Sequence, residues 1–361
     1  MGQPLKIVII SPFQFRLKRG IERFTFSIAN QLAKRGFEVI VYAWATKADK
    51  VQWGLWETGI KIRKVPDSRY FQSNVAGLFY NFWLRKDKPD ICAINFLYHG
   101  EQSLPSTFRY LYILNTPASE VPDRYAFIQD RLHRFPFIRF VAVSEMVKRE
   151  ALPFLRDKMI SVIFNGVDTS VFVPVLTGRI DKQGKTKIIT AAALEERKGI
   201  QHMIHLLGNA GKAFRENIQY DIYGEGAYRE SLYQLIAQYN LQNYISIHSP
   251  VNNLQEILPN YNLFCLMSHG EAMPMAPLEA MACGLPVLCA DCPPFDEFIT
   301  PDVGLLVSPA KTDKIIEFIL RLKDDSTASM FASAARKHSF LFNWDIVTDK
   351  YEQLLTEYRA A

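Results

Sequence analysis

Short runs of apolar, mostly β-branched residues alternate with helical patterns along this chain, and the whole alternation occurs twice. Lys6–Ile10 and Glu38–Ala43 are two such runs, and an amphipathic stretch from Ile21 to Lys34 lies between them and ends before Gly36. Apolar runs of this kind are typical of strands that are buried on both faces of a parallel sheet. The chain is therefore predicted to be an α/β protein built from βαβ units.

The two series are separated by a segment between Asp168 and Lys187 that is rich in Pro, Gly, Thr and charged residues, as linkers are. A length of 361 residues suits two domains of about 150 to 200 residues each. Each half is predicted to form one doubly wound sheet. The further strands expected are Asp90–Ile94, Tyr110–Leu114, Arg139–Val143, Lys187–Ala191, Gln219–Tyr223, Ile245–His248, Leu263–Met267 and Pro286–Cys289. The helices expected in the second half are Ile200–Phe214, Ala227–Tyr239, Leu254–Leu258 and Ala276–Ala282, and Ser144 is expected to cap a helix from Glu145.

Composition excludes several classes of protein. No apolar run reaches the ~18 residues of a membrane-spanning helix, and the N-terminus lacks the order of a secretory signal, so we expect a cytoplasmic protein. Five cysteines give no disulfide framework. Cys289 and Cys292 form a single C-x-x-C with only Cys283 nearby, and we interpret all three as small core residues rather than as a zinc or redox site.

The net charge of +5 hides an asymmetry between the halves. Residues 1–170 contain 25 Lys and Arg against 15 Asp and Glu, whereas the remainder contains 17 against 22. Two interpretations of the basic first half stay open: contact with an anionic acceptor or an acidic membrane surface, at the inner face of the membrane, or a solvated basic face. Nucleic acid is not expected, because no recognition motif accompanies the charge. The basic clusters are Arg16, Lys18, Arg19 and Arg23, and Arg131, Arg134 and Arg139 interleaved with Phe135, Phe137 and Phe140.

Two glutamates, Glu271 and Glu279, bracket an apolar stretch in the second half. If a helix begins at Ala276, Glu279 lies in its first turn and Glu271 on the preceding loop. The N-terminus of a helix offers unpaired N–H groups to an anion, and two nearby carboxylates can accept hydrogen bonds from sugar hydroxyls. A polyhydroxylated, phosphorylated ligand suits this segment. The alternative is a solvated loop glutamate followed by a glutamate that only complements the helix dipole.

Charged and glycine residues follow two other predicted strands. Arg197 and Lys198 lie at the start of a helix, where the dipole disfavours cations unless an anion offsets them, and a diphosphate would do so. Gly224 and Gly226 flank Glu225 at the next helix start, where glycine lets N–H groups approach a phosphate. A solvated cap and an ordinary turn are the alternatives. The chain contains neither a P-loop nor a G-x-G-x-x-G motif, which argues against a nucleotide kinase or a dehydrogenase.

Taken in order, these motifs resemble those of the GT-B glycosyltransferases of family 4, the group 1 glycosyltransferases. The likeness extends over nearly the whole chain. The segments that carry it are Ser11–Arg23, Gly36–Val39, Val143–Ser144, Asn165–Asp168, Arg197–Gly199, Gly224–Gly226, Ser268–Val287 and Asp302–Val307.

The resemblance implies two Rossmann-like doubly wound domains that face a central cleft. We place them at residues 1–170 on the acceptor side and 171–345 on the nucleotide-sugar side, with a helix over 346–361 that packs back on the first. It also implies a retaining, metal-independent hexosyltransferase of polysaccharide biosynthesis. Such an enzyme moves a sugar from a nucleotide diphosphate sugar to a glycan, lipid-linked or small-molecule acceptor and needs no cofactor beyond the donor.

The resemblance assigns roles to single residues. Glu271 would hold hydroxyls of the donor sugar, and Arg197 with Lys198 would neutralise the diphosphate as the glycosidic bond breaks. Glu279 would accept hydrogen bonds from the ribose hydroxyls. The other residues expected to bind the donor are Gly20, Gly224, Gly226, Val251, Met273, Pro274, Met275 and Ala276. No Asp-x-Asp motif for a metal ion is present.

The chain also departs from the family's pattern. Ala193 stands where an arginine is usual, and it stays open whether Arg197 replaces that arginine. Pro274 removes an N–H donor, and Arg19 replaces the first glycine before Gly20. Asn95 replaces a histidine, so Asn95 or His99, four residues on, is expected to contact the sugar or the acceptor.

Two other functions stay open. One is isomerisation or hydrolysis of a nucleotide sugar by the same fold and donor site, and the other, suggested by the missing arginine and histidine, is silent binding of a nucleotide sugar. The sequence does not identify the donor base or sugar, the acceptor, the linkage or the oligomeric state.

Overall fold

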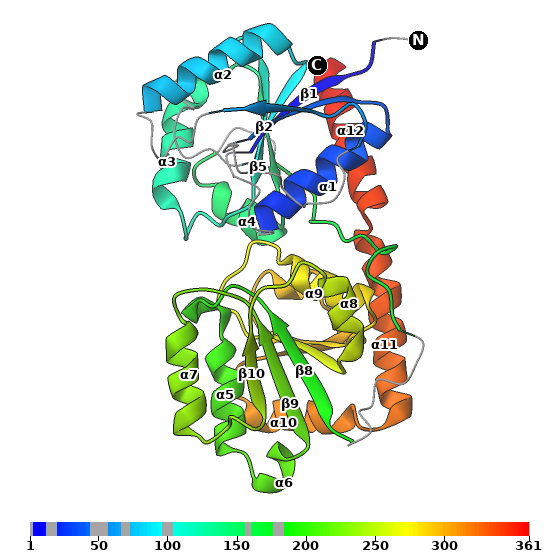
Figure 1. The fold of residues 1–361 in the computed structure, drawn as a ribbon. Coiled ribbons are helices and arrows are strands. Elements are labelled where there is room, and N and C mark those ends of the chain that lie inside the picture. Colours follow the sequence, from blue (N-terminus) through cyan, green and yellow to red (C-terminus); the bar gives the residue numbers. More distant parts are fainter. Residues whose placement is uncertain are drawn as a thin grey trace. The chain divides into compact units, whose positions relative to one another are not determined.

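The computed structural model describes residues 3–11, 20–43, 57–65, 73–95, 104–155, 160–175 and 184–360. The chain divides into two compact units (Figure 1). Unit 1 comprises Met1–Asn165 together with Trp344–Ala361, and unit 2 comprises Gly166–Asn343. The chain thus passes into unit 2 five residues before the expected boundary and returns two residues before the expected C-terminal segment. Val167 shows why, because it forms a parallel bridge with Asn343 inside unit 2.

Unit 1 contains a parallel sheet in the order β3-β2-β1-β4-β5-β6-β7 among its described residues. The strands are β1 (Lys6–Ile10), β2 (Glu38–Ala43), β3 (Lys61–Lys64), β4 (Ile91–Ile94), β5 (Arg109–Leu114), β6 (Ile138–Ala142) and β7 (Ile160–Val162). Five of them confirm predicted strands. The helices are α1 (Gly20–Lys34), α2 (Ser73–Asp87), α3 (Pro122–Arg131), α4 (Glu145–Ala151) and α12 (Trp344–Ala360), with the 3-10 turn η2 (Leu132–Arg134).

The two ends of the chain meet in unit 1, where α12 packs on α1 (Figure 1). The ring of Phe24 in α1 lies 5.9 Å from Trp344 and 6.2 Å from Tyr351, centroid to centroid. The Arg35 guanidinium donates to the Glu352 carboxylate at 3.0 Å. An apolar seam with a polar edge therefore joins the C-terminal helix to the N-terminal domain.

Unit 2 contains a second parallel sheet, in the order β10-β9-β8-β11-β12-β13. Its strands are β8 (Thr186–Ala191), β9 (Ile218–Tyr223), β10 (Ile245–His248), β11 (Leu263–Leu266), β12 (Val287–Ala290) and β13 (Gly304–Val307). Its helices are α5 (Ile200–Asn209), α6 (Lys212–Arg215), α7 (Arg229–Gln238), α8 (Leu254–Ile257), α9 (Met275–Ala282), α10 (Thr312–Arg321) and α11 (Asp325–Ser339). Short 3-10 turns are η3 (Glu196–Lys198), η4 (Leu258–Asn260), η5 (Phe295–Glu297) and η6 (Phe340–Phe342).

One predicted helix of unit 2 is wrong in its length. Residues 200–214 form two helices, because Ala210 and Gly211 are extended, with ψ of 154° and 149°. In unit 1, the predicted cap of α4 is confirmed, because the Ser144 hydroxyl accepts a hydrogen bond from the Val147 N–H at 3.3 Å.

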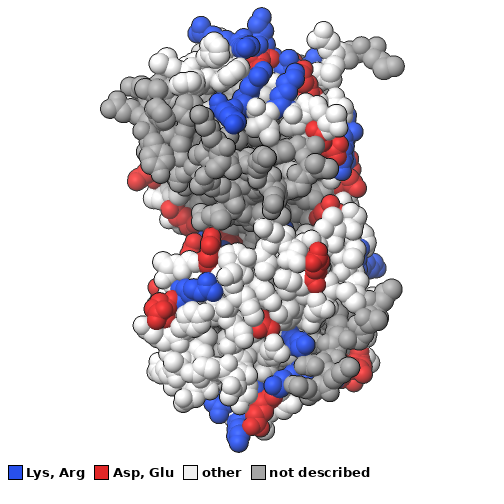
Figure 2. All heavy atoms as spheres, viewed as in Figure 1, with Lys and Arg blue, Asp and Glu red and all other residues white. Residues whose placement is uncertain are grey.

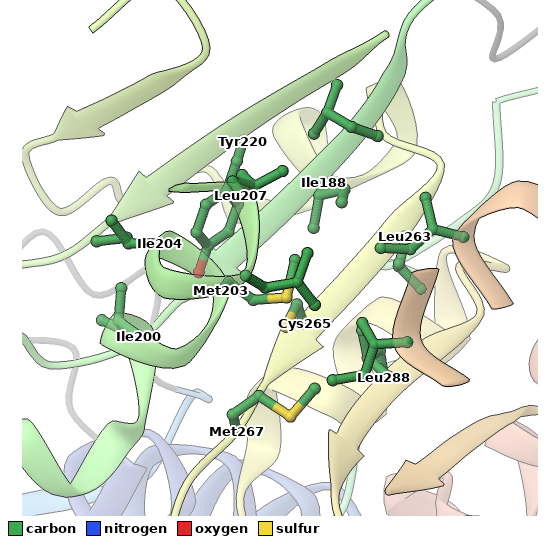
Figure 3. Close-up of a cluster of buried hydrophobic side chains, with 14 of the residues drawn as sticks. Ile188, Ile200, Met203, Ile204, Leu207, Tyr220, Leu263, Cys265, Met267 and Leu288 are labelled. Carbon is green, nitrogen blue, oxygen red and sulfur yellow. The ribbon is translucent and has the colours of Figure 1, made fainter. Parts of the chain in front are cut away.

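The core of unit 2 lies between α5 and the sheet (Figure 3). The residues of this buried cluster that Figure 3 labels are Ile188, Ile200, Met203, Ile204, Leu207, Tyr220, Leu263, Cys265, Met267 and Leu288. Cys283 and Cys289 are also fully buried, and burial raises the pKa of the Cys289 thiol well above its ordinary value. These cysteines thus lie in the core, as small apolar residues do.

Each sheet has a point where the direction of winding changes. In unit 2 this point lies between β8 and β11, which are adjacent in the sheet although β9 and β10 come between them in the chain. Crossovers leave the sheet in opposite directions here, and open α/β sheets bind ligands at the carboxyl ends of the strands on either side of such a point. The same geometry occurs in unit 1 between β1 and β4.

Candidate active site

The loops that follow β8 and β11 are joined by hydrogen bonds at the point where unit 2 changes direction. The carbonyl oxygen of Arg197 accepts from the His269 N–H at 2.8 Å and from the Ser268 hydroxyl at 3.0 Å. The Arg197 guanidinium in turn donates to the Gly270 carbonyl at 3.0 Å. These bonds hold the segment that carries Glu271 against the segment that carries Lys198.

Gly199 allows this close approach. Its φ of 67° lies in the left-handed region, and a Cβ placed on it would lie 1.9 Å from the carbonyl oxygen of Met267. A side chain cannot fit there without moving the backbone of the loop after β11. The glycine that follows Arg197 and Lys198 is therefore required by the geometry of the site.

Lys198 and Glu271 form a buried ion pair. The ammonium Nζ lies 2.5 Å from the carboxylate Oε1, and the two side chains are only 12% and 8% exposed. Two charges removed from water in this way are costly to bury and lose their compensation if either partner is taken away. The structure thus excludes the interpretation of Glu271 as a solvated loop glutamate.

Arg197 takes a different position from that of its neighbour. Its guanidinium donates to the Glu195 carboxylate at 2.8 Å, and its side chain is 43% exposed. With the bond to Gly270, Arg197 holds the two loops together and keeps a positive charge at the rim of the site.

Glu279 lies in α9, where it is 1% exposed. The helix begins at Met275, one residue before the predicted start, so Glu279 is in its second turn rather than the first. A buried carboxylate at this place does not fit the alternative of a solvated residue that only complements the dipole. Pro274 is the N-cap of the helix.

The residues around the start of α9 are partly enclosed. Met273 and Met275 are buried, whereas Pro274 and Ala276 are half-buried. The N–H groups of Met275 and Ala276 belong to the first turn of the helix, which has no carbonyl partners for them inside the helix. The side of α9 that an anion could approach thus begins at the residues predicted to bind the donor.

Gly224 and Gly226 pack the loop after β9 against the loop after β8. A Cβ on Gly224 would lie 1.9 Å from the Ala192 carbonyl oxygen, and one on Gly226 would lie 2.2 Å from that of Leu194. The Leu194 N–H donates to the Glu225 carbonyl at 2.8 Å. Both glycines therefore have a structural reason for being present, whether or not their N–H groups bind a phosphate.

Asn95 follows β4 at the change of direction in unit 1, but its side chain is used inside the protein. It is fully buried, and its amide nitrogen donates to the Thr25 hydroxyl at 2.6 Å. Its amide oxygen accepts from Asn115 at 2.7 Å, and Thr25 also donates to Ser11 at 3.1 Å. The expected contact between Asn95 and a sugar is replaced by this buried network, which fixes α1 to the ends of the strands.

The remaining predicted residues are less informative. Gly20 is the first residue of α1, and no atom lies within 4 Å of a Cβ built on it. Val251 is half-buried after β10. His99, Arg16, Lys18 and Arg19 lie outside the described residues.

Sequence reasoning missed two histidine contacts near these strand ends. The Nε2 atoms of His202 in α5 and His269 in the loop after β11 are 3.0 Å apart. The His248 Nε2 lies 3.0 Å from the buried Asp221 carboxylate, and its ring stacks on Tyr223 at a centroid distance of 4.5 Å. Each contact joins residues that are 25 or more positions apart in the chain, so no local sequence pattern predicts it.

Comparison of the chain with models of protein families identifies the class of protein to which it belongs. A model described as "Glycosyl transferases group 1" matches residues 179–338, and one described as "Glycosyltransferase Family 4" matches residues 18–171. The chain belongs to the group 1 glycosyltransferases. The resemblance inferred from the sequence motifs is thereby confirmed, and it extends over both units.

Curated relatives of this group 1 glycosyltransferase match over part of their length. The putative colanic acid biosynthesis glycosyltransferase WcaL of Escherichia coli is 29% identical over 217 residues, which are 55% of this chain and 51% of that protein. The GtfA subunit of the UDP-N-acetylglucosamine–peptide N-acetylglucosaminyltransferase of Streptococcus agalactiae is 31% identical over 106 residues, 29% of this chain and 21% of that one. The chain spans 19% to 54% of the length of the relatives it matches.

Solved structures establish the fold as the two-domain GT-B type. Sucrose-phosphate synthase of Thermosynechococcus elongatus superimposes with a TM-score of 0.82 at 17% identity and covers 99% of both chains. Alr3699/HepE of Anabaena, in complex with UDP and glucose, gives a TM-score of 0.80 at 17% identity over 98% of this chain and all of the other. The predicted fold class is confirmed.

Proposed function

We propose that the protein is a hexosyltransferase that moves a sugar from a nucleotide diphosphate sugar to an acceptor, with retention of anomeric configuration and without a metal ion. The observation that supports this most directly is the buried Lys198–Glu271 pair at the carboxyl ends of β8 and β11. A cation for the diphosphate and a carboxylate for the sugar meet there at the place where the sheet binds ligands.

The chemistry of transfer calls for stabilising a leaving group. When the glycosidic bond breaks, negative charge grows on the diphosphate, and a fixed cation in a site shielded from water stabilises it more than water would. Lys198 is that cation, and Arg197 adds positive charge at the rim. The diphosphate competes with Glu271 for the ammonium group, which leaves the Glu271 carboxylate able to accept hydrogen bonds from sugar hydroxyls.

The rest of the donor suits the residues that follow. Glu279, buried in α9, is proposed to accept hydrogen bonds from ribose hydroxyls, and the N–H groups of Met275 and Ala276 suit an anionic or polar group of the sugar. These positive groups and the helix N-terminus are proposed to do the work of a divalent cation. Ala193 stands where the family usually has an arginine, and Arg197 is proposed to take over the role of that arginine.

The proposed contacts with an acceptor and with a membrane involve unit 1 rather than the donor site in unit 2. In the basic cluster at Arg131–Phe140, Phe135 and Phe140 are buried and Phe137 is 45% exposed, so one of the three aromatic rings lies at the surface. Helix α2 carries several exposed apolar side chains. Leu78, Phe79 and Phe82 are 67%, 43% and 59% exposed.

Basic side chains lie close to Trp83, the neighbour of Phe82 in the same helix. The Arg63 guanidinium lies 4.5 Å and the Lys86 ammonium 5.2 Å from the ring of Trp83, and Arg85 is exposed beside them. Figure 2 shows Lys and Arg gathered over the end of unit 1 that carries α2. Exposed aromatic residues within a basic rim suit the interface of an anionic bilayer, and we propose an anionic or lipid-linked glycan as acceptor. Among the described residues, no helix is long and apolar enough to cross a membrane.

Turnover with a panel of UDP-, GDP- and ADP-sugars tests the proposal. We expect one donor to be consumed only when an acceptor glycan is present, and the product to keep the anomeric configuration of the donor. Consumption at full rate without acceptor would instead indicate an isomerase or hydrolase. Tight donor binding without turnover over a broad set of acceptors would indicate a silent binding protein.

A further inference from the structure

The loop that carries Glu271 is fastened to α5 by a second contact, apart from the Lys198–Glu271 pair. The Nε2 atom of His269 lies 3.0 Å from that of His202, and the two rings meet edge to face at an interplanar angle of 83°. His269 is two residues before Glu271 and His202 is four residues after Lys198. The two contacts therefore join the same pair of segments from neighbouring positions.

The charge state decides whether this histidine contact can form. A hydrogen bond between two imidazole nitrogens needs one N–H donor and one nitrogen without a proton, so at least one ring must be neutral. When both rings are protonated, two donors and two positive charges face each other at hydrogen-bond distance. The contact then turns from attraction to repulsion.

The surroundings of His202 favour the neutral form. Burial first, and then the neighbouring His269 and His205, lower the pKa of His202 below the ordinary histidine range. His205 lies on the next turn of α5 and contacts the Tyr239 hydroxyl of the residue after α7 at 3.2 Å. Of the other charged groups on the two segments, Lys198 pairs with Glu271 and Arg197 with Glu195, and Glu196 lies in the same 3-10 turn as both cations.

We infer that His202 and His269 are positioning residues, which form a clasp that keeps the Glu271 loop in its active place and opens when both rings carry a proton. The inference rests on the proposed function only in taking Glu271 as a residue that acts on the donor. The clasp itself is a property of unit 2 that needs no donor to be observed.

Hydrogen exchange at about pH 7 tests the clasp in the protein without donor. We expect the peptide that contains Ser268–Glu271 to exchange several-fold faster in His269→Ala and in His202→Ala. His205→Ala, on the next turn of the same helix, is the matched control and is expected to exchange as the unchanged protein does. Equal exchange of this peptide in all four proteins would overturn the inference, whatever the enzyme's donor is.

Activity as a function of pH tests the consequence for transfer. We expect kcat/KM of the unchanged enzyme to fall as the pH drops below about 6.5, the ordinary histidine pKa, because the lowered pKa of His202 puts the second protonation of the pair there. In His269→Gln, the amide keeps a hydrogen-bonding group near the position of Nε2 but does not titrate. This variant should keep most of the activity at pH 7 and lose much of the acid dependence, whereas His269→Ala should lose about tenfold at pH 7.

The two measurements separate failure of the inference from failure of the proposed function. An acid limb that is the same in His269→Gln as in the unchanged enzyme would contradict the clasp. Faster exchange in both alanine variants, in a protein that turned over none of the donors, would support the clasp and contradict the transferase.

Discussion

The proposed chemistry depends mainly on one pair of residues. Lys198 and Glu271 lie 73 positions apart in the chain, and the structure buries them together. The sequence indicated both residues, because each follows an apolar strand and precedes a helix. It did not indicate that they bind each other, since that contact depends on β8 and β11 being adjacent in the sheet. Nor did it indicate the contact between His202 and His269, for the same reason.

The ion pair predicts an unusual pattern of stabilities. Glu271→Leu or Lys198→Met alone should lower the free energy of unfolding by about 3 to 5 kcal/mol, because one buried charge remains without its partner. The double variant should be more stable than either single variant, although inactive, because no buried charge remains. Urea unfolding of the four proteins measures this coupling, and additive losses would show that the pair is not coupled.

Gly199 predicts a sharp contrast between two glycines. Gly199→Ala should destabilise unit 2 by more than about 2 kcal/mol and reduce donor binding, because φ is positive and the new Cβ meets the Met267 carbonyl. Gly211→Ala is the matched control, since φ is −60° and the space is open, and it should change stability by less than about 0.5 kcal/mol. Similar melting curves for both variants would contradict the packing described.

At the scale of elements, sequence patterns predicted best the strands that are buried on both faces of a sheet. Strands β1 and β8 are buried along most of their length and contain runs of β-branched apolar residues, so their positions follow from the sequence alone. By contrast, β3 is a mostly exposed edge strand with the sequence Lys-Ile-Arg-Lys, and β7 has three residues, so neither gives a period that distinguishes it from a loop. The break between α5 and α6 was missed because the apolar positions continue across it.

The C-terminal helix makes a prediction at this scale. Tyr351 is fully buried in the seam between α12 and α1, so Tyr351→Ala should destabilise unit 1 by about 3 to 5 kcal/mol. Arg35→Ala removes ion pairs with the more exposed carboxylates of Asp349 and Glu352 and a hydrogen bond to the Asp345 carbonyl, and should cost about 1 to 2 kcal/mol. Thermal unfolding of the two variants compares them, and the reverse order would show that the polar edge rather than the apolar seam holds α12.

At the scale of the whole molecule, the two halves of the chain differ in charge, whereas exposed apolar side chains occur in both. The sequence showed an excess of positive charge over residues 1–170, and α2 is one described surface where basic residues lie close to exposed aromatic ones. That helix could not be proposed as a docking surface from the sequence alone, because its apolar residues are spread over several faces. Burial of Tyr80 and Leu84 leaves Leu78 and Phe82 outside.

Binding to vesicles tests this surface. The double variant Leu78→Ser with Phe82→Ser should bind vesicles containing phosphatidylglycerol about tenfold or more weakly than the unchanged protein, because each apolar side chain contributes about 1.5 to 3 kcal/mol on leaving water. Tyr233→Ser, which changes a similarly exposed aromatic residue of unit 2, should bind normally. Sedimentation at low and high salt measures both, and equal binding by the two variants would contradict a role for α2.

The central claim is that unit 2 binds a nucleotide diphosphate at the carboxyl ends of β8 and β11. A crystal structure with the best-binding nucleotide sugar is the most direct measurement. The account predicts a diphosphate oxygen within hydrogen-bond distance of Lys198 Nζ and the sugar next to Glu271, with the ion pair between them opened. A nucleotide bound at another place, with the Lys198–Glu271 pair intact, would contradict it.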